Sequence, residues 1–161
     1  TAGWLKWFKS KDTFLVLNGD DLLDIDISKV LNYHKKFTAE RNLHSMATIV
    51  LANKEDVSDS GSVDWRVHPE SCGNFGMIDR FREKTGEKKS GLVSTGLYLL
   101  EPQVCDMARR FNKDFIMFET DIFPEINHLG RLYGYKTKGQ WFPTGNYAEI
   151  HKAIEQWQKV K

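Results

Sequence analysis

The segment FLVLNGDD, residues 14–21, joins four apolar residues to a cluster typical of a turn. A short, unbroken apolar run that ends in turn residues predicts a strand buried on both faces, as in a parallel sheet. In open α/β sheets, ligands bind beyond the carboxyl ends of the strands. This one segment therefore predicts a strand of the sheet and the edge at which a binding site would lie.

The turn after this strand carries the first candidate site residue. Gly19 lets the backbone approach a ligand closely, and the carboxylate of Asp20 can hold a hard cation such as Mg²⁺. In the alternative interpretation, the aspartates only satisfy backbone groups of an ordinary turn. This motif alone does not decide between the two.

The rest of the chain alternates strand and helix patterns. Apolar β-type runs occur at residues 45–51, 93–100 and 132–137. Helices are predicted over residues 3–9, 28–37, 102–111, 119–129 and 147–157. Ser28 and Pro102 suit helix starts, and Gly130 suits the position just past a helix end.

Residues 62–67 and 75–81 form a different pattern, because the turn residues Pro69, Gly73 and Asn74 separate them. Two such runs around a turn predict an antiparallel hairpin. The whole pattern predicts an α/β fold with a Rossmann-like, mostly parallel sheet and an antiparallel hairpin elaboration. A length of 161 residues fits a single domain over residues 1–161.

Composition excludes several classes of partner. Lysine and arginine number 23 against 22 acidic residues, so the net charge of +1 predicts no general attraction to nucleic acid or anionic membrane. No apolar stretch approaches the roughly 20 residues of a membrane span. Cys72 and Cys105 lack metal-type spacing, and free thiols in a reducing compartment are favoured over a disulfide. A cytoplasmic protein is predicted.

A second candidate site follows the hairpin in the segment FREK, residues 81–84. Glu83 could accept hydrogen bonds from sugar hydroxyls, while Lys84 would offset the charge of a phosphate. Charged residues also occupy positions 87–89. The alternative is therefore a solvated charge cluster.

The order of the motifs resembles that of the sugar-phosphate nucleotidyltransferase family, which includes mannose-1-phosphate guanylyltransferases and glucose-1-phosphate thymidylyl- and cytidylyltransferases. The motifs are TAG (1–3), FLVLNGD (14–20), GSV (61–63), FREK (81–84), VSTGLYLLEP (93–102) and GRLYGYKTKGQW (130–141). The resemblance runs from residue 1 to about 157, and the chain resembles the C-terminal two-thirds of a family member.

The resemblance implies residue roles at the nucleotide and the metal. Thr1, Ala2 and Gly3 correspond to the end of a loop against the nucleotide. Asp20 corresponds to the aspartate that binds the catalytic Mg²⁺, and Lys84 is implied as a second catalytic residue.

The resemblance also implies a sugar-phosphate site. The residues implied there are Gly61, Glu83, Lys84, Ser94, Thr95, Gly96 and Trp141. In the family reaction, the sugar 1-phosphate attacks the α-phosphorus of a nucleoside triphosphate, and pyrophosphate leaves. Positioning and charge neutralisation carry such phosphoryl chemistry.

Two departures from the family pattern bear on activity. The family begins with a strand and a Gly-rich loop that wraps the triphosphate, and nothing similar precedes Thr1, so the chain is expected to be truncated at its N-terminus. The family also places a second metal-binding aspartate shortly after the tryptophan, where this chain has Pro143 or Gly145. The chain is therefore expected to be inactive alone.

Three hypotheses follow from the family pattern and its departures. The chain is part of an active nucleotidyltransferase, a non-catalytic sugar-phosphate-binding protein, or an assembly module with no site. The strand at residues 14–17 would form an apolar sheet edge, which proteins seldom leave bare. A homodimer that covers this edge is expected, with Trp4, Trp7 and Phe8 as candidate contributors to the cover.

Overall fold

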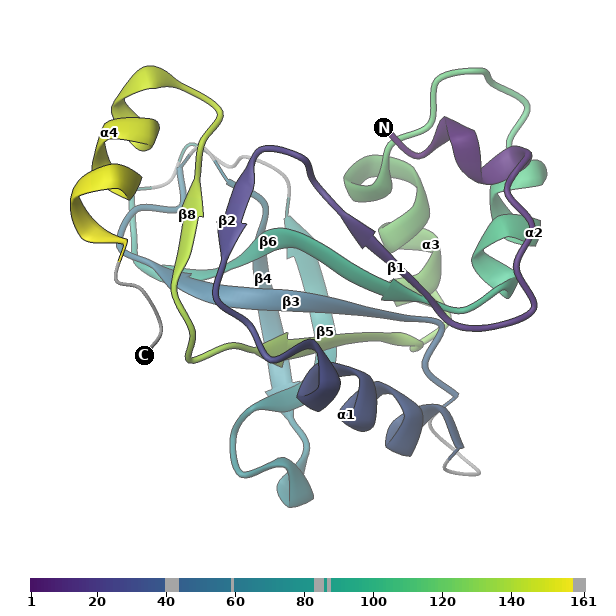
Figure 1. Cartoon of the computed structure of the whole chain (residues 1–161). Helices are drawn as coiled ribbons and strands as arrows, with labels where there is room; N and C mark the ends of the chain where they lie inside the picture. The colour runs from purple at the N-terminus through teal and green to yellow at the C-terminus, as the bar shows by residue number, and fades with distance from the viewer. Residues whose placement is uncertain (40–43, 59, 83–85, 87, 158–161) are drawn as a thin grey trace.

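The structure is a computed structural model that describes residues 1–39, 44–58, 60–82, 86 and 88–157. A six-stranded sheet forms its centre, and a two-stranded ribbon lies beside it (Figure 1). The strands are β1 (Phe14–Leu17), β2 (Asp21–Leu23), β3 (Ala47–Lys54), β4 (Ser62–Val67), β5 (Phe75–Arg82), β6 (Gly91–Leu100), β7 (Leu132–Lys136) and β8 (Trp141–Pro143). The helical segments are η1 (Gly3–Lys6), α1 (Ile27–Ala39), η2 (Pro69–Ser71), α2 (Gln103–Arg109), η3 (Phe118–Ile122), α3 (Phe123–His128) and α4 (Tyr147–Gln156).

The sheet has the strand order β1-β6-β3-β7-β5-β4. The α/β class and the β4–β5 hairpin are confirmed, but the pairing is not mostly parallel: β3 pairs with β7 in parallel, and the other pairs described in this sheet are antiparallel. β1, β3 and β7 do run in one direction, while β6 lies between β1 and β3 in the opposite direction. An apolar run reports burial on both faces and carries no information on strand direction.

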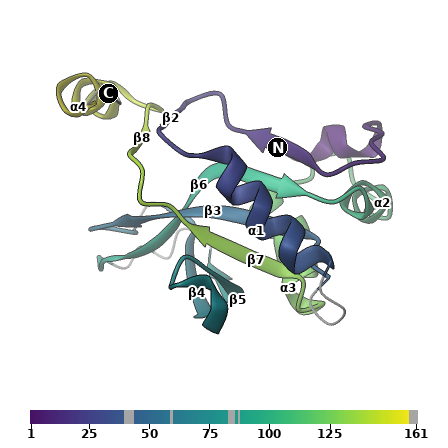
Figure 2. The same cartoon turned by 60° about the horizontal axis from the view of Figure 1, so that its bottom comes forward.

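Helices cover both faces of the sheet. On one face, α1 lies across the sheet (Figure 2). Its Val30 and Phe37 belong to the same buried cluster as Val50 and Tyr133 of the strands. On the other face, η1, α2, η3 and α3 pack against the alternate strand residues, including Ile49 and Leu51. Because neighbouring residues of β3 point to opposite faces, this strand is buried almost throughout. Both clusters are apolar, as the sequence pattern predicts.

The helix boundaries differ from the predictions at three places. Asp26, rather than Ser28, caps α1, because its carboxylate accepts the amide of Lys29 at 3.1 Å. The opening helix is a short 3₁₀ segment that ends at Lys6. The helix predicted from residue 119 begins with a π-helical turn, and α3 continues from it after Ile122.

The ribbon of β2 and β8 was not predicted. It pairs Asp21 with Pro143 and Leu23 with Trp141. Its end is fixed by Thr144, whose amide and hydroxyl both donate to the carbonyl of Asp20 at 2.8 Å. The ribbon therefore holds the turn after β1 against the segment that follows β7.

β1 lies at an edge of the described sheet. Phe14 and Val16 pack on the larger apolar cluster, whereas Leu15 and Leu17 are 41% and 50% exposed. The expectation that this strand is buried on both faces is therefore wrong for the described chain, because no helix covers its second face. No helix in the described part of the chain has the length and apolar character needed to cross a bilayer.

Candidate functional site

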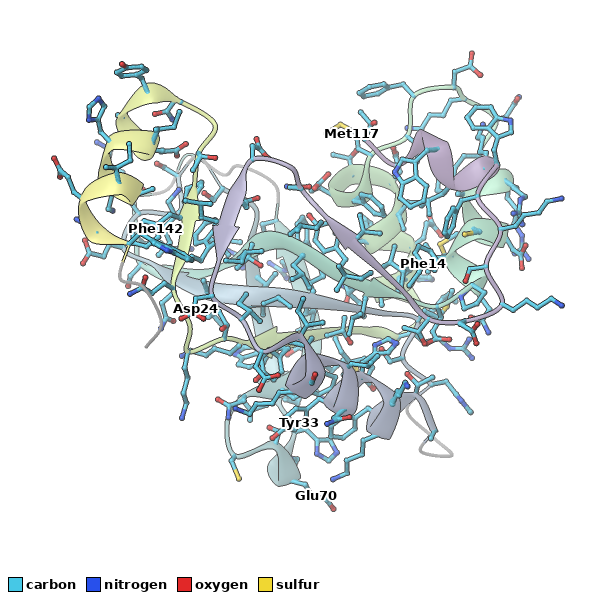
Figure 3. The ribbon with its side chains drawn as sticks, in the orientation of Figure 1. Phe14, Asp24, Tyr33, Glu70, Met117 and Phe142 are labelled. Atoms are coloured by element: carbon cyan, nitrogen blue, oxygen red, sulfur yellow. The ribbon has the colours of Figure 1, made fainter. Side chains whose placement is uncertain are left out.

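A cavity of about 460 Å³ opens where β1 ends and the ribbon begins. Its volume suits a small-molecule ligand. The lining residues are Thr1, Asn18, Asp20, Asp21, Lys54, Ser60, Gly61, Phe81, Ser94, Gly96, Tyr98, Met117, Glu119, Trp141, Pro143, Gly145 and Glu149. In Figure 3, Met117 lies on the side of η1 and α3, and Phe142 lies on the side of β8 and α4. The lining residues, from Thr1 to Glu149, thus come from both ends of the chain.

The structure brings together six of the sequence-predicted site residues at this cavity: Thr1, Asp20, Gly61, Ser94, Gly96 and Trp141. Ala2, Gly3 and Thr95 do not line it. Ala2 is fully buried with its amide on the carbonyl of Ile116, and the Thr95 hydroxyl donates to the carbonyl of Val50 at 3.0 Å. Glu83 and Lys84 lie outside the described residues.

The acidic side of the cavity is held in place by Trp141, whose indole N–H donates to Oδ1 of Asp21 at 2.8 Å. Burial raises the pKa of the Asp21 carboxyl, the Trp141 bond opposes that rise, and the neighbouring Asp20 carboxylate adds to it. Gly96, whose φ is +75°, lies close to the Asp21 carboxylate. A Cβ on Gly96 would lie 2.6 Å from Oδ2 of Asp21, so this position requires glycine.

A chain of hydrogen-bonded polar side chains also lines the cavity. The Ser94 hydroxyl is 3.4 Å from that of Tyr98, which is in turn 3.4 Å from Oε1 of Glu119. Burial, and then the Glu119 carboxylate, raises the pKa of the Tyr98 hydroxyl. Tyr98 therefore stays a neutral hydrogen-bonding group that links Ser94 to Glu119.

A positively charged side chain, that of Lys54 at the end of β3, also lines the cavity. The ammonium of Lys54 donates to the Ser60 hydroxyl at 2.7 Å beside Gly61. Lys54, Trp141 and Glu149 also line an adjoining cavity of about 600 Å³. The two cavities therefore share part of their lining.

Sequence reasoning missed Asp21, Lys54, Glu119 and Glu149. Glu119 and Glu149 lie in the first turns of η3 and α4. Acidic residues are common at such positions because they interact favourably with the helix dipole. Lys54 lies beyond the predicted β-type run at residues 45–51, although it is the last residue of β3. The available signal was positional, because Lys54 follows an apolar run at the strand end where ligands bind.

The carboxylates at the cavity fit a hydrated divalent cation but no closed metal site. The described residues contain no group of three or more His, Cys, Asp or Glu side chains placed to hold a metal ion. A Cβ on Gly145 would, however, lie 3.6 Å from Oε2 of Glu149 and 3.7 Å from Oδ2 of Asp20. Mg²⁺ keeps several waters and takes one or two carboxylates together with substrate phosphates. Two carboxylate oxygens around one open position match that requirement.

Comparison with known proteins bears directly on the family. The family model described as "Nucleotidyl transferase" matches residues 3–160. A mannose-1-phosphate guanyltransferase of Yarrowia lipolytica is 31% identical over 150 residues, which cover 90% of this chain and 37% of that protein. The catalytic subunit beta of Xenopus tropicalis mannose-1-phosphate guanylyltransferase is 29% identical over 85% of this chain and 34% of its own length. The chain thus spans about a third of these relatives.

Solved structures show the same fold. HddC of Yersinia pseudotuberculosis has a TM-score of 0.69 at 22% identity and matches 98% of this chain and 62% of its own. A Bacillus anthracis protein assigned as a glucose-1-phosphate thymidylyltransferase has a TM-score of 0.78 at 19% identity, over 99% of this chain and 60% of its own. The Rossmann-like architecture is confirmed by these neighbours. Since the family model covers almost the whole chain and the curated relatives agree with it, the chain belongs to the nucleotidyl transferase family.

Proposed function

We propose that this chain forms the sugar-phosphate side of an enzyme that transfers a nucleotidyl group from a nucleoside triphosphate to a sugar 1-phosphate. Pyrophosphate would be the second product. The observation that carries the proposal is the convergence of Asp20, Ser94, Glu119 and Trp141 on one cavity at the end of β1. The chain would act in the cytoplasm as a single domain equivalent to the C-terminal two-thirds of a family member.

The lining groups suit the two parts of a sugar phosphate. Sugar hydroxyls both donate and accept, and they can bond the Ser94 hydroxyl and the Glu119 carboxylate. The Lys54 ammonium offers positive charge for the phosphate, as Lys84 does in the sequence-based prediction. Mg²⁺, when bound at Asp20, would neutralise charge on the phosphates.

Titration calorimetry with mannose 1-phosphate and glucose 1-phosphate tests the proposal, with free mannose and inorganic phosphate as controls. Saturable binding of a sugar 1-phosphate, tighter than that of either control, is expected. Glu119→Gln should weaken it by roughly 10- to 150-fold, since a hydrogen bond to a charged group contributes about 1.5–3 kcal/mol. Glu125→Gln, on the exposed side of α3, should leave it unchanged.

The outcomes separate the three hypotheses. Pyrophosphate release from a sugar 1-phosphate and a triphosphate would support catalysis. Binding without release under every pairing would favour a non-catalytic sugar-phosphate-binding protein. No heat with any sugar 1-phosphate would leave only an assembly role and would reject the proposed site.

We also propose that a second copy of the chain covers the open edge of β1. The exposed Leu15 and Leu17 support an apolar contact there, and Trp7, which precedes β1 in the chain and is 77% exposed, is a further candidate. Sedimentation velocity is expected to show a dimer, and Leu17→Glu should dissociate it. A monomer at all concentrations would contradict this part of the proposal.

A further inference from the structure

Among the described residues, four carboxylates line the cavity, and two of them already bond other parts of the fold. Asp21 accepts the indole N–H of Trp141, and Glu119 is bonded to the buried Tyr98 hydroxyl. Within the described part of the chain, the carboxylates of Asp20 and Glu149 have no hydrogen-bond or ion-pair partner. These two are therefore the carboxylates that have both oxygens available to a ligand.

The backbone fixes the two residues on either side of one open position. The carbonyl of Asp20 accepts both the amide and the hydroxyl of Thr144, which places Gly145 beside Asp20. Asn146 then caps α4 by accepting the amide of Glu149 at 3.0 Å. This cap sets Glu149 at the third helical position, and its side chain turns back toward Gly145.

The space between the two carboxylates is open because residue 145 is glycine. The ideal Cβ position on Gly145 has Glu149 Oε2 and Asp20 Oδ2 as its neighbours, both at ordinary contact distance. Glu149 is half-buried, so its charge is less fully hydrated than that of a surface glutamate. Two like charges that face one position attract a cation there.

We propose that Glu149 supplies the second carboxylate of a divalent-cation site opposite Asp20, and that it replaces the acidic residue that positions 143 and 145 lack. The ion would be held by these two carboxylates, by water and by substrate phosphates. The proposal rests on the function proposed above in one respect: a phosphate-transfer reaction indicates Mg²⁺ as the cation. Metal binding is measured without sugar phosphate or nucleotide, so the two proposals can fail independently.

The competing interpretation gives Glu149 a purely structural role. Asn146 and Glu149 have the spacing of a capping box, in which the third helical residue reaches back to the cap. Glutamine serves a capping box as well as glutamate does, but it is a poor ligand for a hard cation. Glu149→Gln therefore separates the two roles without loss of the helix cap.

The experiment is a titration of the ¹⁵N-labelled chain with Mn²⁺, followed by the broadening of amide signals. In the unaltered chain, saturable broadening is expected at Gly19, Gly145 and Asn146, while Gly130 at the far end of α3 stays sharp. Glu149→Gln and Asp20→Asn should each weaken Mn²⁺ binding about tenfold or more, since even residues that only orient metal ligands contribute 10–100-fold. Glu155→Gln, an exposed glutamate of the same helix, is the matched control and should change nothing.

A rescue variant completes the test. Glu149→Gln combined with Gly145→Asp should restore Mn²⁺ binding, because residue 145 has room for a side chain that points between residues 20 and 149. The proposal is overturned if Glu149→Gln behaves like Glu155→Gln. It is also overturned if the unaltered chain shows no saturable broadening around Gly145. The spectra of all variants report at the same time that the fold is intact.

Discussion

The indole N–H of Trp141 donates to the carboxylate of Asp21 across 120 residues of sequence, at 2.8 Å. This bond joins β8 to β2 and sets the wall of the cavity against which Asp20 lies. The ribbon, rather than the large sheet, thus determines how the end of β1 faces the last segment of the chain.

Trp141→Phe should destabilise the fold. The substitution keeps an aromatic side chain but removes the indole N–H that donates to the half-buried Asp21 carboxylate, which costs about 1–3 kcal/mol. Because the Trp141 bond lowers the pKa of Asp21, its loss should also raise that pKa further. Urea denaturation measures the first effect and NMR titration of the carboxyl the second. Trp7→Phe, at a side chain that is 77% exposed, should leave both unchanged.

Gly96→Ala should destabilise the protein more than an alanine at another left-handed glycine. At Gly96 a Cβ would meet Asn18 Nδ2 at 2.5 Å and Asp21 Oδ2 at 2.6 Å, whereas at Gly73, with a φ of +83°, it would meet nothing within 4 Å. Gly73→Ala should lower the free energy of unfolding only by the cost of a left-handed backbone conformation, about 1–2 kcal/mol. Equal losses of unfolding free energy in the two variants would contradict this expectation, because they would show that the close contact of Asp21 with Gly96 of β6 does not contribute to stability.

Stability in acid should depend on Glu101. Its carboxylate bonds the buried His34 at 2.9 Å and also Thr13, and the bond from His34 is the main reason that its pKa lies below the ordinary value. The unfolded chain therefore binds this proton more readily than the folded chain does. The stabilisation is complete above the ordinary pKa of 4.5 and is lost as the pH falls through the lower folded value.

Melting temperatures measured from about pH 6 down to about pH 3 test this dependence. Glu101→Gln should flatten the curve in the acid part of the range. Glu125→Gln, which changes charge by the same amount on α3, should reproduce the slope of the unaltered chain. A slope that survives Glu101→Gln would assign the acid sensitivity to other carboxyls.

Lys54→Ala should weaken sugar 1-phosphate binding while the binding of free sugar stays the same. The ammonium lies at the cavity wall, and its attraction to a phosphate depends on charge. Binding by the unaltered chain should therefore weaken with salt, and the variant should lose most of that salt dependence. Lys35→Ala, on an exposed part of α1, should not alter it. Calorimetry at two ionic strengths gives both quantities.

The apolar runs and turn residues predicted most of the elements correctly. Phe14–Leu17, the hairpin around Pro69 and the glycine that ends α3 are each local signals. The direction of β6 was not predictable, because a run buried on both faces looks the same in either direction. β2 and β8 have only three residues each, too few for a periodic pattern.

The site was predicted only in part, because a local sequence pattern does not show which residues meet in three dimensions. Asp20 and Trp141 stood out as residues beside turns in motifs of recognisable order. Glu119 and Glu149 did not, because an acidic residue in a first helical turn is explained by the helix dipole alone. Only the three-dimensional arrangement shows that both of these carboxylates line the cavity with Asp20.

The central claim is that this cavity binds a sugar 1-phosphate, and the most direct measurement maps that ligand on the protein. Addition of mannose 1-phosphate to the ¹⁵N-labelled chain should shift the amides of Gly61, Ser94 and Gly96 and the indole signal of Trp141. Free mannose at the same concentration should shift them much less. Shifts confined to residues outside the cavity, or none at saturating ligand, would contradict the account.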